Sequence, residues 1–478
     1  MLRNPKTKIV ATVGPASSSP AMLEQLIDAG VSVFRLNFSH GTHDDHSAVV
    51  GHLRSISRRR GRHVAILQDL CGPKIRLGPI PGDVVDCQLG EEFSLVAGAS
   101  SERPHELTCS YEQITNDLKT GETVLFADGT VAMVVVDAVP GRVRMKVTLA
   151  GRLRSRQGLN LPGTELAVPS LTPKDFVDLD WTARHADDVD FVGLSFVRTA
   201  ADVLHLREAL RSRRCPAHVV VKIEKPQAVA HLDEIVAAAD GVMVARGDLG
   251  VEMNMPQVPA IQKRIIAVCN RAERPVITAT QMLNSMEHSN RPTRAEATDV
   301  FNAVIDGTDA VMLSGESAVG EYPVESVKTM AEICREAEAY LKSQPHRSRG
   351  DAAPRGLVDD VTAASVDAAC EMTERLDAAL IVVASETGRT AVAISNRRPS
   401  ATILALMRTE AVARSLSLCW GVTATLLPES SSVERVLEYG VDWARANDLA
   451  KTGQHAVLLR GHVVDRPSIR AILAGIIP

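Results

Sequence analysis

Charged and hydroxyl side chains stand at the ends of apolar runs that are typical of buried β-strands. Four such runs end at residues 222–224 (KIE), 246–248 (RGD), 278–280 (TAT) and 314–316 (SGE). An unpaired buried charge is costly, so a chain that repeats this pattern is expected to build a polar site there. Because residues two apart along a strand share a side, we expect Lys222 to pair with Glu224. The same spacing predicts a pair between Arg246 and Asp248.

These residue types suit the chemistry of a divalent cation and a negatively charged substrate. Glu224 and Asp248 offer the hard oxygen ligands that Mg²⁺ or Mn²⁺ prefers, with the rest of the coordination shell left to substrate and water. Lys222 is suited to stabilise negative charge that develops on a phosphoryl group or an enolate. Two ion pairs, with Lys222 and Arg246 as the cations and no metal, remain the alternative interpretation.

A second polar corner follows the apolar run at residues 31–37. Arg35 could hold a phosphate group with two parallel hydrogen bonds. Asn37, Ser39 and Asp69 add oxygen ligands beside it. No GxxxxGK[ST] and no GxGxxG pattern occurs in the sequence, so a nucleotide would not be held by either of those loops.

The composition is that of a globular protein with two or three domains, since the chain has 478 residues, 45% of them hydrophobic and 23% charged. Aromatic residues make up 3% and the formal net charge is −5, which argues against nucleic acid and membrane partners. The eight cysteines are scattered without a CxxC pair. No apolar run approaches the ~20 residues of a membrane span. We therefore expect a cytoplasmic protein with reduced cysteines.

Strand-like and helix-like segments alternate in a way that predicts a closed (β/α)₈ barrel, whose active site lies at the carboxyl ends of the strands. The expected strands are residues 8–13, 31–37, 63–69, 190–196, 218–224, 241–248, 275–281 and 310–316. Amphipathic stretches between them include residues 21–29, 201–213, 228–239 and 258–271. The charged strand ends then lie on the functional face.

The barrel is expected to be interrupted and extended by two further domains. Residues 1–73 and 171–342 would form the barrel, and residues 74–170, rich in Val, Gly and Pro, would form an inserted all-β lid. Asp128-Gly129 marks a hairpin within it. Residues 343–356 have the composition of a linker or surface loop. Residues 357–478 would form an α/β domain with a small open sheet, on strands 380–384, 402–406, 423–427 and 456–459.

Several long motifs resemble those of the pyruvate kinase family, in order, from about Lys8 to the C-terminus: RLNFSHG, GPKIR, VKIEK, MVARGDLGVE, ATQML, RPTRAE and MLSGESAVGEYP. The resemblance implies transfer of phosphate from phosphoenolpyruvate to ADP, giving pyruvate and ATP. It also implies a homotetramer and a lid domain that closes over the substrates and excludes water.

The resemblance also implies roles for individual residues. Glu224 and Asp248 would hold the divalent metal, and Lys222 would stabilise the phosphoryl group in transfer. The backbone amides of Gly247 and Asp248 would hold the substrate carboxylate, with Thr280 near the path of the proton that converts enolate to pyruvate. On the phosphate and nucleotide side the residues are Arg35, Asn37, His40, Arg76 and Lys174.

Two departures from the common family pattern concern a monovalent cation. Members that need K⁺ generally carry a Thr after the aspartate and a Glu in the GPEIR segment, where this chain has Leu70 and Lys74. Asn37, Ser39, Asp69 and the Leu70 carbonyl could still form a cation site. An ammonium from Lys74 would supply the charge itself and repel a nearby cation. The sequence therefore predicts activity without added K⁺.

A loop in the third domain could hold an anion. Hydroxyls and backbone amides at a helix N-terminus form an anion site, and in the family the matching loop holds an activator's phosphate. The loop residues are Ser385, Glu386, Thr387, Gly388, Arg389 and Thr390. The segment 461–478 lacks the Trp- and Gly-containing loop of members activated by fructose 1,6-bisphosphate, which favours a monophosphate such as AMP or a sugar monophosphate. A capped helix start without a ligand is the alternative.

Two rival functions remain. An aldolase-like barrel acting on pyruvate would use Glu224 and Asp248 for metal-assisted enolate chemistry without a nucleotide, but it would not require Arg76, Lys174 or the long insertion. A catalytically silent effector-binding protein would need a broken catalytic set. Every member of that set is present: Arg35, Lys222, Glu224, Asp248 and Thr280.

Overall fold

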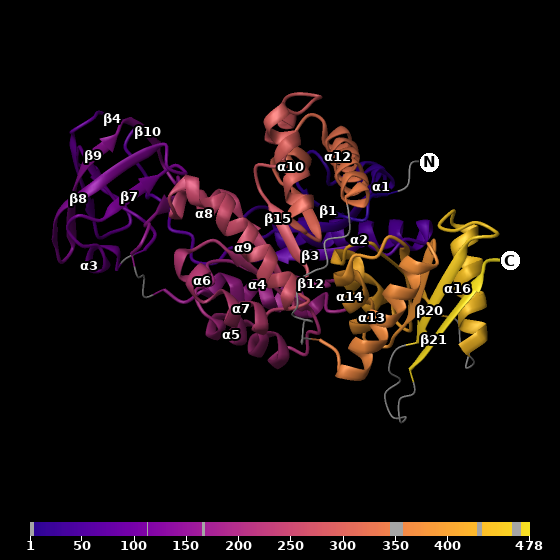
Figure 1. The fold of residues 1–478 in the computed structure, drawn as a ribbon. Coiled ribbons are helices and arrows are strands. Elements are labelled where there is room, and N and C mark those ends of the chain that lie inside the picture. The colour runs from indigo at the N-terminus through magenta and orange to yellow at the C-terminus, as the bar shows by residue number, and fades with distance from the viewer. Residues whose placement is uncertain (1–3, 112, 165–167, 345–356, 428–432, 461–469) are drawn as a thin grey trace.

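Eight parallel strands close into a barrel at the centre of the molecule, as the alternation of segments predicted (Figure 1). The computed structural model describes residues 4–111, 113–164, 168–344, 357–427, 433–460 and 470–478. Around the barrel the order is β1-β16-β15-β14-β13-β12-β3-β2. The strands are β1 Lys8–Val13, β2 Val31–Asn37, β3 Ala65–Asp69, β12 Phe191–Leu194, β13 His218–Ile223, β14 Gly241–Ala245, β15 Val276–Ala279 and β16 Ala310–Leu313.

Both faces of the barrel strands are buried, which explains their almost continuous apolar sequences. The interior is filled by side chains of alternate positions, among them Leu67, Phe191 and Met243. The outer faces pack against a ring of helices. That ring comprises α1 Pro20–Ala29, α2 His43–Arg60, α4 Pro173–Arg184, α5 Ala200–Ser212, α6 Pro226–Ala230, α7 Leu232–Ala238, α9 Val258–Arg271, α10 Arg294–Asp306 and α12 Pro323–Ser343.

Local sequence signals set where several of these helices begin. Thr42, Thr172 and Thr293 each cap a helix, and each is followed three residues later by an acidic side chain that returns a hydrogen bond. The expected helix at residues 228–239 is instead two short helices, α6 and α7. Several barrel strands also end earlier than predicted, most importantly β14, which stops at Ala245 where α8 Arg246–Glu252 begins.

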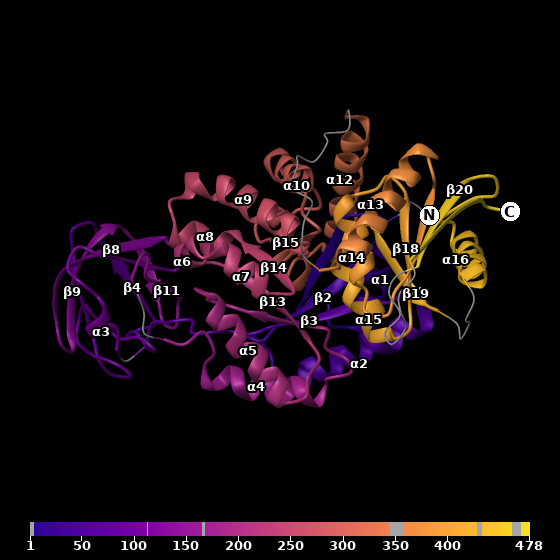
Figure 2. The same cartoon turned by 60° about the horizontal axis from the view of Figure 1, so that its bottom comes forward.

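Between β3 and α4 the chain leaves the barrel and forms a separate all-β unit, seen at the left of Figures 1 and 2. Its six-stranded sheet has the order β11-β7-β8-β9-β5-β6, and β4 pairs with β10. The bounds are β4 Val84–Cys87, β5 Glu92–Val96, β6 Glu106–Leu107, β7 Thr123–Phe126, β8 Val131–Val139, β9 Arg142–Leu149, β10 Gly151–Arg154 and β11 Leu159–Asn160, with the short helix α3 Ile114–Asp117. This unit has its own apolar core.

The C-terminal part forms an open five-stranded sheet with the order β19-β18-β17-β20-β21. Its elements are α13 Asp360–Arg375, β17 Leu380–Ala384, α14 Arg389–Arg397, β18 Thr402–Met407, α15 Glu410–Ser415, η3 Leu416–Leu418, β19 Val422–Leu426, α16 Val433–Ala446, β20 His455–Arg460 and β21 Ala471–Ile476. The sequence did not predict β21, which pairs antiparallel with β20. Of the predicted linker, Ser343 closes α12, while residues 345–356 lie outside the described residues.

The C-terminal sheet unit and the inserted β unit lie at opposite ends of the barrel (Figure 2). Leu418 packs into the apolar cluster of the barrel interior. Arg414 of α15 donates from Nε to Asp190 Oδ1 at 2.8 Å, just before β12 begins. The C-terminal unit therefore covers the amino ends of the strands, and the carboxyl ends face the insertion. No helix in the described parts of the chain is long and apolar enough to cross a membrane.

Candidate active site

Lys222, near the carboxyl end of β13, lies at the centre of a buried polar cluster. Its Nζ lies 2.8 Å from Glu224 Oε1 and 3.5 Å from Asp69 Oδ1. It also donates to Ser195 Oγ at 2.9 Å. Only 12% of the Lys222 side chain and 2% of each carboxylate side chain are exposed. The predicted pair between Lys222 and Glu224 is present, and Asp69 joins it from β3.

Burial and electrostatic pairing act in opposite directions on the pKa of each group in this cluster. Burial alone would lower the pKa of Lys222, but the carboxylates of Asp69 and Glu224 outweigh it and raise that pKa. Burial would likewise raise the pKa of Asp69, but Lys222 and Arg35 hold it below its ordinary value. For Glu224 burial prevails, so its pKa is raised although Lys222 acts against the shift. Lys222 is thus a permanent ammonium at neutral pH.

Arg35, on β2, is fixed in place rather than free. Its Nε donates to Asp69 Oδ2 at 2.7 Å, Nη2 lies 2.6 Å from the same oxygen, and Nη1 donates to Thr12 Oγ1 at 3.0 Å. Thr12 in turn donates to the carbonyl of Leu313. Thr12 and Ser195 were not predicted, because each contacts a residue of another strand that is its neighbour only in the folded barrel. Asp69 therefore orients both an arginine and a lysine toward one site.

Glu224 and Asp248 are the two carboxylates of this site that could hold a divalent cation. Glu224 Oε2 accepts the Phe196 amide at 2.9 Å, so the carboxylate is held in one orientation. Asp248, in the first turn of α8, is close enough to raise the pKa values of Lys222 and Glu224. In the described residues no group of three or more His, Cys, Asp or Glu side chains could hold a metal alone. A cation here needs oxygens from substrate and water, as Mg²⁺ commonly does.

Gly247 and Thr280 meet between α8 and the end of β15. The Gly247 amide donates to Thr280 Oγ1 at 2.8 Å. Thr280 has a φ of +65° and Gln281 a φ of +53°, a conformation that non-glycine residues rarely adopt and that is most unfavourable for a β-branched side chain. The turn thus places the Thr280 hydroxyl beside the Gly247 amide in the first turn of α8.

The predicted pair between Arg246 and Asp248 is wrong. Both residues belong to α8, so the alternation of a strand does not apply to them. The Arg246 guanidinium is buried and lies 2.6 Å from Asp299 of α10. Of the two ion pairs in the alternative interpretation, the one between Lys222 and Glu224 is present, whereas Arg246 pairs with Asp299 and not with Asp248.

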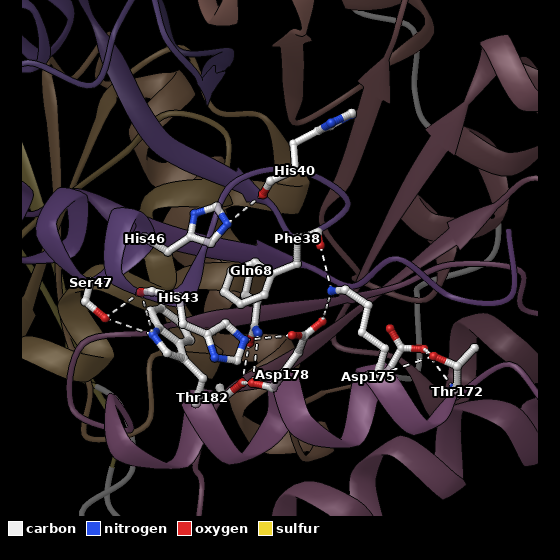
Figure 3. A network of polar contacts seen from close by, with 12 residues as sticks. Phe38, His40, His43, His46, Ser47, Gln68, Thr172, Asp175, Asp178 and Thr182 are labelled. Atoms are coloured by element: carbon white, nitrogen blue, oxygen red, sulfur yellow. Dashed lines mark hydrogen bonds and ion pairs between the residues drawn. The ribbon is translucent and has the colours of Figure 1, made fainter. Parts of the chain in front are cut away.

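Lys174 and the segment after β2 form the network in Figure 3. Lys174 Nζ donates to the Phe38 carbonyl at 2.8 Å and to Asp178 Oδ2 at 2.6 Å, and the second oxygen of Asp178 accepts His43 Nε2 at 2.8 Å. The His46 ring donates to the His40 carbonyl at 3.0 Å, while the imidazole of His40 points away from the network. Asp178 and His43 were not predicted, since neither follows a strand.

Positive charge gathers around His40. Partial burial lowers the pKa of its imidazole, and the positive charges of Arg76 and Lys74 lower it further. Arg76 lies at the start of the insertion and donates from Nη1 to the Arg156 carbonyl at 3.3 Å. His40 is therefore surrounded by cations, an environment suited to polyanionic phosphates.

The residues predicted for a monovalent cation lie at or just after the carboxyl ends of β2 and β3. Asn37 Oδ1 accepts the Ser39 amide at 3.1 Å, and the Leu70 carbonyl accepts Ser195 Oγ at 2.8 Å. Asp69 Oδ1 is buried without a hydrogen-bond partner among the described residues, although Lys222 lies nearby. Lys74 is exposed, with its side chain beside Gly158 of the insertion.

The loop at residues 385–390 joins β17 to α14. Ser385 Oγ accepts the Gly388 amide at 3.2 Å, and Gly388 has a φ of +77° that favours glycine. Glu386 lies 3.4 Å from Arg408 Nε. Thr387 and Arg389 are exposed, whereas Thr390 is buried. Ser385 therefore closes the turn before α14, whose N-cap residue Gly388 provides no side-chain cap, and the loop presents a hydroxyl and a guanidinium to solvent.

Comparisons with known proteins agree over nearly the whole chain. Residues 4–327 match the family model "Pyruvate kinase, barrel domain" and residues 363–468 match "Pyruvate kinase, alpha/beta domain". A pyruvate kinase of Geobacillus stearothermophilus is 41% identical over 459 residues, covering 95% of this chain and 77% of the relative. One from Agrobacterium vitis is 42% identical, covering 96% and 95%. A crystal structure of a pyruvate kinase from Cryptosporidium parvum superimposes with a TM-score of 0.89 at 34% identity, covering 99% and 96%.

Proposed function

Because the chain belongs to the pyruvate kinase family, we propose that it transfers the phosphoryl group of phosphoenolpyruvate to ADP, giving pyruvate and ATP. The observation that carries the proposal is the Lys222 ammonium, held at 2.8 Å from Glu224 at the mouth of the barrel, with Asp69 and Arg35 behind it. Phosphoryl transfer depends on positioning and on positive charge around the moving group rather than on covalent chemistry by the protein.

Lys222 and Arg35 are the groups that would face the phosphoryl group. Both are fixed by Asp69, so neither loses much side-chain freedom when substrate binds. Glu224 and Asp248 would hold Mg²⁺ or Mn²⁺. When bound, the cation would neutralise phosphate and carboxylate oxygens of phosphoenolpyruvate. Burial raises the pKa of Glu224, so a divalent cation beside this carboxylate would stabilise its ionised form.

The corner formed by Gly247, Asp248 and Thr280 would hold the substrate carboxylate. The Gly247 amide donates to the Thr280 hydroxyl, so an incoming carboxylate oxygen would share or replace that acceptor. Thr280 would then lie beside the enolate carbon that takes up a proton after phosphoryl transfer. Holding the carboxylate here fixes the distance between the phosphate and Lys222.

ADP would lie on the side of Asn37, His40, Arg76 and Lys174. The support for this side is the accumulation of cations, which lowers the pKa of His40. The inserted β unit is attached at the same end of the barrel and would close over both substrates. Closure would exclude water, which otherwise competes as the phosphoryl acceptor.

A coupled assay of pyruvate formation from phosphoenolpyruvate, with and without ADP, tests the function. We expect turnover that requires ADP and a divalent cation. Pyruvate or enolate chemistry independent of ADP would favour the aldolase-like alternative, and no turnover with an intact fold would favour a silent effector-binding protein.

We further propose that activity does not require K⁺. The support is that Leu70 and Lys74 stand where members that need K⁺ generally carry Thr and Glu, and that the Lys74 charge acts on His40. We also propose that the loop at residues 385–390 binds an activating monophosphate, AMP or a sugar monophosphate. The exposed Thr387 hydroxyl and Arg389 guanidinium support this. A cytoplasmic homotetramer is proposed from the family resemblance.

A further inference from the structure

Arg246 is a buried arginine whose guanidinium hydrogen-bonds to neighbouring backbone and side-chain groups of the protein. Only 8% of the residue is exposed. Its guanidinium lies beneath the turn that follows β15 and donates to three consecutive carbonyls, those of Ala279, Thr280 and Gln281. The distances are 3.3, 2.7 and 3.3 Å. Asp299 of α10 completes the arrangement with an ion pair at 2.6 Å.

The turn that Arg246 holds is strained. Thr280 and Gln281 both have positive φ, at +65° and +53°. Such a conformation persists in non-glycine residues only where the surroundings impose it. Gln281 is exposed, so its own side-chain packing does not impose it. Nη2 of Arg246 donates hydrogen bonds to the carbonyl oxygens of these two residues, which links the strained turn to one cation.

The same arginine is anchored in the element that carries the other half of the carboxylate corner. Arg246 is the first residue of α8, and the next residue, Gly247, donates its amide to Thr280 Oγ1 at 2.8 Å. Backbone and side chain of adjacent residues thus hold Thr280 from two directions. The spacing between the Gly247 amide and the Thr280 hydroxyl is set by this pair of contacts.

We propose that Arg246 is a positioning residue that holds the left-handed turn at Thr280 and Gln281 and thereby shapes the site for the carboxylate of phosphoenolpyruvate. The inference rests on the proposed function for Gly247 and Thr280. A planar guanidinium can serve Asp299 and several carbonyls at once, whereas a lysine presents all its donors from a single nitrogen and cannot span them. Arginine at this position is therefore required by geometry and not only by charge.

The test begins with Arg246→Lys in the full chain. We expect the KM for phosphoenolpyruvate to rise about tenfold or more, because a small displacement of a positioning group has a large effect, while the KM for ADP stays within about twofold. Asp299→Asn is the milder second variant, since Asp299 is 38% exposed and its loss is tolerated more easily by the fold. It should raise the KM for phosphoenolpyruvate by about threefold.

Rescue by glycine separates positioning from general destabilisation. Gln281→Gly relieves the strain of a positive φ without removing buried atoms. In the Arg246→Lys background, Gln281→Gly should lower the raised KM for phosphoenolpyruvate by at least about threefold. No recovery, together with equal changes in both KM values, would overturn the inference.

Arg54→Lys is the matched control. Arg54 is 6% exposed, donates to the Val64 carbonyl at 2.7 Å and pairs with Asp190 at 2.7 Å, but it lies at the opposite end of the barrel. It should lower stability with both KM values unchanged. If it raises the KM for phosphoenolpyruvate as much as Arg246→Lys does, positioning is refuted. Absence of activity in the wild-type enzyme would instead refute the proposed function.

Discussion

Replacing Lys222 by Met tests the central electrostatic argument, because it keeps an unbranched side chain of similar volume and removes the ammonium. The ammonium lies 2.8 Å from Glu224 and 3.5 Å from Asp69, both of which are buried. Removing one partner of a buried ion pair costs about 3–5 kcal/mol. Asp69 keeps Arg35 at 2.6 Å, so most of the cost falls on Glu224. Protonation of Glu224 limits it, and we expect a loss of about 3 kcal/mol in the free energy of unfolding without metal.

The pH dependence of that loss follows from the sign of the shift. Burial already raises the pKa of Glu224, and Lys222 is the largest influence against it. In the Lys222→Met variant the pKa rises further, so the folded state binds more protons than the unfolded state. Stability then falls as pH rises. Without metal, the variant should be more stable near about pH 6 than near about pH 8, as measured by urea unfolding.

Turnover and metal binding should respond in opposite directions. Loss of a preorganised cation costs about 10²–10³ in kcat. The variant should bind Mg²⁺ or Mn²⁺ at least as tightly as the wild-type protein does, because the positive charge of Lys222, which repels the metal cation, has been removed. Calorimetric titration with Mn²⁺ and the coupled assay measure the two effects. Saturating Mg²⁺ should also restore part of the lost stability.

Lys225→Met provides the matched control. Lys225 is also 12% exposed, and its Nζ lies 2.6 Å from Glu252, whose side chain is 1% exposed. Both substitutions therefore remove the ammonium of a buried ion pair, at neighbouring positions. Lys225→Met should lower stability by a similar amount while kcat stays within about fivefold. Near-normal turnover of Lys222→Met, or equal loss of turnover in both variants, would refute the reasoning.

Three further predictions concern the cations and the effector. In Tris or tetramethylammonium buffer, added KCl should change the activity of the wild-type protein by less than about tenfold. The Lys74→Glu variant should require K⁺ for activity. Strong stimulation of the wild-type protein by K⁺ would contradict this. Asp178→Asn removes the negative charge that lies 2.6 Å from the half-exposed Lys174. The KM for ADP should rise about 5- to 20-fold, while the KM for phosphoenolpyruvate stays unchanged. Equal changes in the two KM values would argue against this role. AMP or a sugar monophosphate should shift the phosphoenolpyruvate saturation curve to lower concentrations, and Thr387→Ala should weaken the shift; no response to any monophosphate would count against the effector site.

The sequence was sufficient for the barrel because each strand buries both faces and each intervening helix carries one apolar face. Those patterns are local, so they can be recognised in the sequence without knowing which strands and helices pack together. The polar strand ends identified the functional face for the same reason. Lys222 and Glu224 were paired correctly because β13 remains extended up to Ile223.

The prediction failed where local conformation changed without a sequence signal. β14 passes into α8 at Arg246 with no glycine, proline or capping residue before it, since the N-cap residue is Ala245. Strand spacing was therefore applied to residues of a helix. Thr12 and Ser195 were missed for another reason. Each acts on a residue that is distant in sequence, and a contact such as that between Thr12 and Leu313 exists only when the barrel closes.

The two cations that the sequence presented as equivalent differ in what they hold. Lys222 is bonded to carboxylates that a metal and substrate can also use, so its removal changes the charge of the reacting groups. Arg246 is bonded mainly to carbonyls and to Asp299, so its removal changes where Thr280 stands and leaves the charge at the mouth of the barrel intact. The first substitution should therefore act on kcat and the second on the KM for phosphoenolpyruvate. A lysine suffices where a point charge is needed, and an arginine is needed where backbone geometry has to be held.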